Sequence, residues 1–488
     1  MTAMLQQCVC IFLVLVFASL TRGGGGRDDE VFTYDPELDM DAIQLITSKG
    51  YPAEAHYVNT SDGFILGLQR IPYGRNEKPP KQGRPVVFLQ HGLLCASTNW
   101  LTNLRNESLG YILADAGFDV WLGNIQLITS KGYPAEAHYV NTSDGFILGL
   151  QRIPYGRNEK PPKQGRPVVF LQHGLLCAST NWLTNLRNES LGYILADAGF
   201  DVWLGNVRGN TYSKNHTYLK PDQNAFWAWS FDEMAAYDLP SMVNYVLKVS
   251  NQKKLSYVGH SQGTTMGFIA FSNNQQLAEK INLFVALAPV ANVTNMESPI
   301  AYLSHFLPEI QFLLDILGIK EFLPNTELID LIAKDICNKP NEYMFCKNII
   351  FVLCGYDAKN LNQTRLPVYY THCPAGTSVQ DVLHWAQMVR AGNFQMYDYG
   401  AGGNLKKYNQ DTPPLYSVDN MEVPVALYSG GEDWLADPTD VDDVTPRLKN
   451  VVRNLRLQDY DHLDFVWGMD AASRLYPDVL AMLKKYAV

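Results

Sequence analysis

Several features that would point to a particular class of protein are missing from this chain. It has no long cluster of basic residues and a net charge of −10, which argues against a polyanion such as nucleic acid as a partner. It has no Cys-x-x-Cys pair and no Cys/His array, so we expect no metal site. Apart from one apolar run near the start, no stretch reaches membrane-spanning length without charges, so we expect no integral membrane span.

The composition is that of an ordinary globular protein. Of the 488 residues, 47% are hydrophobic and 18% are charged, which allows one large domain or a few smaller ones. The apolar run Cys8–Leu20 is too short to span a bilayer comfortably, and small and polar residues follow it. This pattern predicts a cleaved signal peptide over residues 1–22, although no Lys or Arg precedes the run; an uncleaved anchor is the alternative.

Secretion would place the cysteines in an oxidising compartment. Cys337 and Cys346 are nine residues apart and could close a small disulfide loop there. Asn-x-Ser/Thr sequons also fit a secretory route, although such triplets arise by chance as well. The seven sequons begin at Asn59, Asn106, Asn141, Asn188, Asn215, Asn292 and Asn362.

The segment VVFLQHGLLC occurs twice, at 86–95 and at 168–177. It belongs to a longer perfect repeat in which residues 43–124 recur as 125–206, with an offset of 82 at every position. Solenoid repeats are shorter, diverge in sequence and come in more than two copies. We therefore interpret the repeat as a recent duplication or a gene-assembly error rather than an architecture.

From the second copy onward, apolar runs alternate with helical patterns. The predicted strands are 167–174, 200–206, 255–260, 282–290, 423–433 and 451–462. The predicted helices are 179–199, 231–251, which has an internal Pro240, and 263–281. Buried apolar strands that alternate with helices predict a mostly parallel α/β sheet.

The alternation stops between residues 291 and 422, where the apolar helical runs 302–319 and 327–337 occur. We expect this insertion to form a helical cap or lid over the carboxyl edge of the sheet, because open α/β sheets place their sites at that edge. A structural subdomain with no role in access is the alternative, since apolar helical stripes are more often core. The remaining segments, 125–290 and 423–488, would then form the sheet and its flanking helices.

The pentapeptide Gly259-His260-Ser261-Gln262-Gly263 lies where a strand meets a helix. A nucleophile needs its hydroxyl raised on a tight turn, and flanking glycines let the neighbouring backbone approach. The five-residue pattern alone is weak, but the strand and helix around it give it context. Ser261 is therefore the candidate nucleophile.

A serine nucleophile needs a histidine base that a carboxylate holds in the right tautomer. In this type of fold the chain order is Ser, acid, His, and His462 is the histidine beyond the last strand end that bears an acid. The histidines of the insertion, His305, His372 and His384, come too early. In GGEDWLADPTD, which follows the strand VALYS, the carboxylates are Glu432, Asp433, Asp437 and Asp440. The glycines after VALYS end the strand, so Asp433 lies on the first turn beyond the sheet and is the candidate acid. Asp437 is the alternative, although an Asp before Pro is commonly a helix N-cap.

An ester-cleaving site also needs amide donors for the oxyanion of the tetrahedral intermediate. One is the residue after the nucleophile, Gln262. The other comes from the loop after the His-Gly strand, which offers Leu93 in the first copy and Leu175 in the second.

Eight motifs in order resemble the gastric and lysosomal acid lipase family, from about residue 33 to the end of the chain. They are LQHGLL, ADAGFDVWLGNVRGNTYS, FDEMAAYDLP, YVGHSQGTT, ALAPVA, PAGTSVQ, GGEDWLADPTDV and DHLDFVWGMDA. The resemblance implies an α/β-hydrolase fold with a cap and lid, and hydrolysis of triacylglycerols or cholesteryl esters at lipid surfaces. The extra copy of 82 residues departs from the family.

The resemblance also assigns residues. The serine, aspartate and histidine of the family fall on Ser261, Asp433 and His462, and its oxyanion amides fall on Gln262 and the Leu after His-Gly. Its cap disulfide corresponds to Cys337 with Cys346.

Either copy could supply the first strands of the sheet. If the first copy were used, 82 residues would have to be looped out, at a closure cost of about 4 kcal/mol plus a constant. We therefore expect the sheet to use the second copy, with Leu175 as the donor, and residues 43–124 to be surplus. The opposing argument is the leader VFTYDPELDMDA, which is contiguous with the first copy. We expect the first copy not to complete a sheet alone, and its apolar strands to be an aggregation hazard.

Together these observations predict a secreted or lysosomal serine hydrolase that acts on lipid esters at a lipid–water interface. It would work through an acyl-enzyme and need no cofactor. The alternative is a lipid-binding protein on a hydrolase scaffold, or a hydrolase that the duplication has inactivated.

Overall fold

The structure is a computed structural model, and it divides into two compact units. It describes residues 42–59, 65–75, 77–80, 83–90, 100–101, 105–124, 128, 131–298, 301, 304–316, 318–323 and 359–487. The large unit contains the described residues of Glu136–Pro154 and Pro162–Val488. The small unit contains those of Gly25–Ala135 and Tyr155–Pro161.

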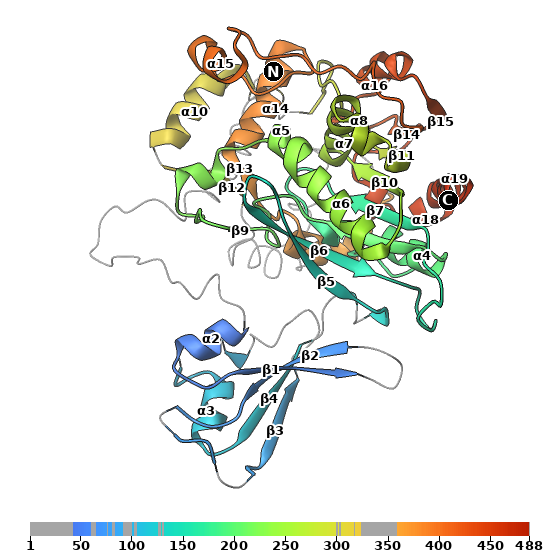
Figure 1. The fold of residues 1–488 in the computed structure, drawn as a ribbon. Helices are drawn as coiled ribbons and strands as arrows, with labels where there is room; N and C mark the ends of the chain where they lie inside the picture. The colour runs from blue at the N-terminus through green and yellow to red at the C-terminus, as the bar shows by residue number, and fades with distance from the viewer. Residues whose placement is uncertain are drawn as a thin grey trace. The chain divides into compact units, whose positions relative to one another are not determined.

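The large unit is built on a nine-stranded sheet with the order β15-β14-β11-β10-β7-β8-β6-β5, in which β9 pairs with β6 (Figure 1). The strands are β5 Glu136–Asn141, β6 Phe146–Ile153, β7 Val168–Gln172, β8 Asp201–Gly205, β9 Asn215–His216, β10 Leu255–His260, β11 Ile281–Leu287, β14 Val425–Gly430 and β15 Val451–Leu457. From β8 to β15 all neighbours are parallel, whereas β5 and β6 are antiparallel. The predicted mostly parallel sheet is confirmed.

The central strands have apolar sequences because both of their faces are covered. Every residue of β7, β8, β10 and β14 is buried. Helix α6 (Leu239–Ser250) packs on β5, α7 (Gln262–Asn273) on β10 and β11, α4 (Leu191–Asp197) on β6 and β8, and α19 (Tyr476–Tyr486) on β11. All four long strands that precede β10 come from the second copy of the repeat.

The predicted helix 179–199 is wrong, because the segment forms a 3₁₀ helix at Ser179–Trp182 and then α4. The side chain of Asn185 accepts a hydrogen bond from Leu186 N at 2.8 Å and donates to Trp467 O at 3.2 Å. The Asn185–Leu186 bond competes with the bonds of a helix. The identical segment of the first copy also starts its helix at the equivalent residue, Leu109, so the break is a property of the repeated sequence.

The predicted helix around Pro240 forms in three consecutive parts. A capping box at Ser230 starts α5 (Phe231–Glu233), a π-helical turn spans Met234–Asp238, and α6 follows. Pro240 lies in the first turn of α6, where its missing N–H costs little.

The described part of the insertion is helical, with the predicted run 302–319 forming a 3₁₀ turn and then α10. The helices are α10 Leu307–Ile316, α13 Leu366–His372, α14 Val379–Ala391 and α15 Ala401–Tyr408, and the short strands β12 Glu321–Phe322 and β13 Thr377–Ser378 pair with each other. The predicted helical run 327–337 lies outside the described residues. Within the described ranges, no helix is both long enough and apolar enough to cross a bilayer.

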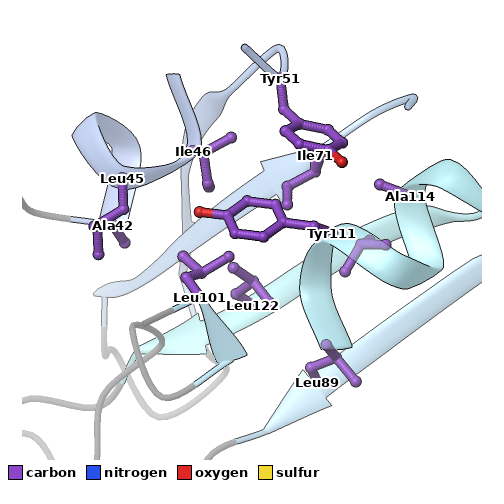
Figure 2. Close-up of a cluster of buried hydrophobic side chains, with 11 residues drawn as sticks. Ala42, Leu45, Ile46, Tyr51, Ile71, Leu89, Leu101, Tyr111, Ala114 and Leu122 are labelled. Atoms are coloured by element: carbon purple, nitrogen blue, oxygen red, sulfur yellow. The ribbon is translucent and has the colours of Figure 1, made fainter. Parts of the chain in front are cut away.

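The small unit contains the first copy and has a sheet of its own, in the order β1-β2-β4-β3. Its elements are α2 Ala42–Ser48, β1 Glu54–Asn59, β2 Ile65–Ile71, β3 Val86–Gln90, α3 Leu109–Asp115 and β4 Asp119–Asn124. Figure 2 shows its core, where the rings of Tyr51 and Tyr111 stack at 4.9 Å beside Ile46 and Leu122. Our expectation that this copy would not complete a sheet is wrong, because its strands pair among themselves.

Candidate functional site

Ser261 occupies the tight turn between β10 and α7. Its φ is +55°, a conformation that is uncommon for residues other than Gly. The turn also needs glycine on both sides: a Cβ at position 259 would lie 2.7 Å from the backbone of Gly263, and a Cβ at position 263 would lie 2.5 Å from Gln172 O. The strained turn presents the Ser261 hydroxyl beyond the carboxyl end of β10.

The structure brings the three predicted residues Ser261, His462 and Asp433 together. Ser261 Oγ lies 2.7 Å from His462 Nε2, and His462 Nδ1 lies 3.0 Å from each carboxylate oxygen of Asp433. His462 and Asp433 are both buried. The distances fit a hydroxyl that donates to Nε2 and an Nδ1–H that donates to the carboxylate.

The loop that contains Asp433 fixes its carboxylate. Asp433 Oδ1 accepts hydrogen bonds from Leu435 N at 3.0 Å and from Ala436 N at 2.8 Å. The alternative acid, Asp437, instead accepts from Thr439 N at 2.7 Å and is the N-cap of α16 (Pro438–Val444). Asp433 is therefore the carboxylate that can orient His462.

The predicted oxyanion residues flank Ser261 from two directions. Gln262 is the first residue of α7, and the first four amides of a helix have no acceptor within it. Leu175 follows Gly174, whose Cβ, if it had one, would lie 2.8 Å from Ser261 Cβ. The His-Gly loop therefore passes in contact with the serine, as an oxyanion loop must.

Sequence reasoning missed the role of His173, although its place in the His-Gly motif was a signal. His173 Nδ1 lies 2.8 Å from Gly174 O, and Nε2 accepts a hydrogen bond from Val207 N at 3.3 Å. Burial lowers the pKa of His173 to about 4, so the ring is neutral and its Nδ1–H donates to the carbonyl. His173 therefore fixes the backbone immediately before Leu175.

The segment after β8 completes the support of this loop. Asn206 Oδ1 accepts from Ser179 N at 2.9 Å, and Asn210 Nδ2 lies 3.1 Å from His173 Nε2. Residues 207–210 follow only the second copy of the repeat. The equivalent loop of the first copy, with Leu93, lies outside the described residues.

His260, the residue before Ser261, also lies next to the site, in a role that its place in the pentapeptide does not predict. Its Nε2 lies 2.9 Å from the backbone oxygen of His462, and burial lowers its pKa to about 3, so the ring stays neutral and donates there. Asp461, on the other side of His462, is buried and accepts from Leu463 N at 2.8 Å. Burial raises the pKa of Asp461 to about 7.

The remaining histidine and cysteine candidates lie elsewhere. His384 is buried against Ser230 and the backbone of Gln395, and burial lowers its pKa to about 4. Cys337 and Cys346, the predicted disulfide, lie outside the described residues. In the part of the chain that the structure covers, no cluster of three His, Cys, Asp or Glu side chains could hold a metal ion.

Sequence comparisons with known proteins match the part of the chain that contains this site. The α/β hydrolase fold family matches residues 167–469, and the partial α/β-hydrolase lipase region matches twice, at 42–104 and 125–186. Gastric triacylglycerol lipase of Rattus norvegicus is 51% identical over 359 residues, which cover 73% of this chain and 90% of that protein. Lysosomal acid lipase/cholesteryl ester hydrolase of Macaca fascicularis is 47% identical over 396 residues, which cover 81% and 98%. The predicted α/β-hydrolase fold is confirmed.

Proposed function

Since the chain belongs to the α/β-hydrolase family of gastric and lysosomal acid lipases, we propose that it is a lipase that hydrolyses the carboxylic ester bonds of lipids. Triacylglycerols and cholesteryl esters are the proposed substrate classes, because the names of these relatives specify them. The observation that carries the proposal is the hydrogen-bonded chain from Ser261 through His462 to Asp433.

In the first half of the proposed reaction, Ser261 Oγ attacks the acyl carbonyl while His462 Nε2 takes its proton. Asp433 holds the Nδ1–H and stabilises the imidazolium that forms. The amides of Gln262 and Leu175 donate to the oxyanion of the tetrahedral intermediate. His462 then gives its proton to the leaving alkoxide, and the acyl group remains on Ser261.

In the second half, water attacks the acyl-enzyme as His462 takes its proton. The second tetrahedral intermediate uses the same two amides, and its collapse returns the proton to Ser261 Oγ and releases the fatty acid. These steps need no cofactor.

We further propose the division of the chain and its route. Residues 125–290 with 423–488 form the catalytic core, 291–422 its cap or lid, 43–124 a surplus copy, and 1–22 a signal peptide that directs it to secretion or the lysosome. The exposed sequons support the secretory route, since glycans need accessible Asn side chains. Among the sequons whose Asn side chain the structure describes, the exposed ones are Asn106, Asn141, Asn188 and Asn215.

A serine-directed phosphonate and a long-chain triacylglycerol emulsion test the proposal. The phosphonate should label Ser261, and Ser261→Ala should lose both labelling and turnover. Ser272→Ala, a buried serine on the same helix α7, is the matched control and should keep both. Continued turnover by Ser261→Ala would contradict the mechanism, and lipid binding without turnover by the unmodified protein would favour a lipid-binding protein.

A further inference from the structure

One face of α14 in the insertion docks next to the candidate site. Ser378 Oγ, at the N-cap of α14, donates to Trp229 O at 2.5 Å, and Asp381 Oδ1 accepts from Phe231 N at 2.9 Å. The His384 ring stacks on that of Phe231 with 3.9 Å between their centroids. These positions recur every three residues along α14, so they share one helix face.

The same face holds the side chain of Gln262. Trp385 Nε1–H donates to Gln262 Oε1 at 2.7 Å, and Gln262 Nε2 lies 3.4 Å from Met234 Sδ. Gln262 is 2% exposed, so both ends of its amide are fixed inside the protein. Its backbone N–H, the proposed oxyanion donor, belongs to the same residue and directly follows the strained Ser261.

The loop that contains Leu175, the second proposed oxyanion donor, is held by the same stretch of the insertion. Ala375 N donates to Leu176 O at 2.6 Å, and Thr211 N in turn donates to Ala375 O at 3.0 Å. Leu176 has φ +59° and lies third in the turn Gly174–Cys177, a conformation that usually requires Gly. Such a conformation persists only where its surroundings enforce it, and Ala375 supplies that contact next to Leu175.

We propose that Trp385 and Ala375 are positioning residues for the oxyanion hole, so that the insertion is part of the catalytic apparatus and not only a cover. This inference rests on the proposed function. An oxyanion hole accelerates the reaction only if its donors are held in place before the charge develops. Two residues of the insertion, Ala375 and Trp385, hold the two oxyanion donors in place, so loss of either contact lowers transition-state stabilisation.

Trp385→Phe keeps an aromatic ring but removes the indole N–H together with the five-membered ring that carries it. We expect kcat to fall about tenfold with KM unchanged, which is less than the loss of a direct oxyanion donor causes. Phosphonate labelling of Ser261 should slow by the same factor, because that reaction also forms an oxyanion. The matched control is Trp227→Phe, which removes an indole hydrogen bond of the same length, 2.7 Å, to Pro221 O and should leave kcat unchanged. Equal kcat in the two variants would overturn the proposal for Trp385.

A double variant distinguishes positioning from a general loss of stability. Gln262→Met removes the side-chain acceptor and keeps the backbone amide, so Trp385→Phe combined with Gln262→Met should be no slower than the slower single variant. Losses that multiply would show that the two residues act separately and would refute the inference. If Ser261→Ala remained active, the proposed function itself would fail, whatever the Trp385 result.

Ala375→Pro removes the N–H that donates to Leu176 and tests the support of the second proposed oxyanion donor, Leu175. We expect the same pattern of lower kcat and unchanged KM, in protein whose circular dichroism matches the unmodified chain. Unchanged kcat in that folded variant would remove Ala375 from the proposal.

Discussion

The two copies of the repeat have one sequence and two environments. Val168 and Phe170 on β7 are 3% and 0% exposed, whereas the equivalent Val86 and Phe88 on β3 are 64% and 54% exposed. The strand β7 lies between β8 and β10, whereas β3 is the last strand in the order of its sheet. The apolar pattern therefore predicts a strand in both places, but its burial depends on sequence that lies outside the repeat.

The contacts inside each copy are nearly identical. Arg152 donates to Asp201 at 2.8 Å and to Glu136 at 2.9 Å in the large unit. In the small unit Arg70 makes the equivalent bonds at 2.7 and 2.9 Å. The register of the two hairpins is also the same, with Glu136 opposite Arg152 and Glu54 opposite Arg70. Hairpin register and ion pairs are therefore local properties of this sequence.

Substitution of the first residue of β7 and of β3 by Lys should give the largest difference between the two copies in folding and turnover. Val168→Lys places a charge with no partner in the central sheet, at a cost of more than about 4 kcal/mol, and should abolish folding of the large unit and all turnover. Val86→Lys should leave turnover unchanged and reduce light scattering at high concentration, because a charge on an edge strand opposes aggregation. Loss of turnover in Val86→Lys would mean that the first copy supplies the catalytic sheet.

Replacement of the first leucine of α4 and of α3 by Ala should give a smaller difference between the copies, in the free energy of unfolding. Leu191 is 1% exposed and Leu109 is 41% exposed. Leu191→Ala should lower the free energy of unfolding of the large unit by about 2–5 kcal/mol, and Leu109→Ala should change that of the small unit by less than about 1 kcal/mol. Urea unfolding followed by turnover and by tryptophan fluorescence measures both; equal losses would show that the two helices are equally packed.

The units should also differ in how pH affects their stability. Burial raises the pKa of Asp381 to about 7 and of Asp232 to about 6, so the folded large unit retains protons that the unfolded chain releases near pH 4. The contribution of these two carboxyls to stability should therefore fall as pH rises from about 4 to 8, by on the order of a few kcal/mol. The buried neutral His173, His260 and His384 contribute the opposite slope below the unfolded His pKa of about 6.5. In the small unit, hydrogen bonds from His56 and Arg70 lower the pKa of Glu54. Ionised Glu54 therefore stabilises the folded small unit at pH values above the pKa that Glu54 has in the unfolded chain. Thermal unfolding at pH 4 and pH 8 checks this: compared with the unmodified chain, Asp381→Asn should gain stability at pH 8 relative to pH 4.

The smallest effects should be the same in both copies. Glu54 and Glu136 each pair with Arg and His, and the side chain of each is 41% exposed. Glu54→Gln and Glu136→Gln should each cost less than about 1 kcal/mol, and by the same amount, because exposed ion pairs contribute little. A clearly larger loss for Glu136→Gln would show that even the hairpin contacts depend on the surrounding sheet.

The sequence predicted the parallel sheet and the positions of Ser261, Asp433 and His462, because apolar strand patterns and the glycines around Ser261 are local signals. The interrupted helix at Asn185 was missed although it recurs at the equivalent place in the first copy, because the helical pattern of 179–199 does not show that the Asn185 side chain bonds to the backbone of Leu186. The contacts of Trp385 with Gln262 and of Ala375 with Leu176 were missed because each joins residues that are far apart in the sequence. Such contacts depend on how the insertion packs against the rest of the large unit, and the hydrophobic periodicity of the sequence carries no information about that packing.

His173 takes its hydrogen bond from Val207, just beyond the end of the repeat, and this has a consequence for evolution. We expect selection to constrain the second copy more strongly than the first, because only the second copy adjoins Val207, to which the His-Gly loop is hydrogen-bonded. We expect substitutions to be tolerated at the exposed Phe88 and to be destabilising at the buried Phe170. The first copy is surplus in the proposed division of the chain, so we expect changes on its edge strand β3 to leave ester hydrolysis unaffected.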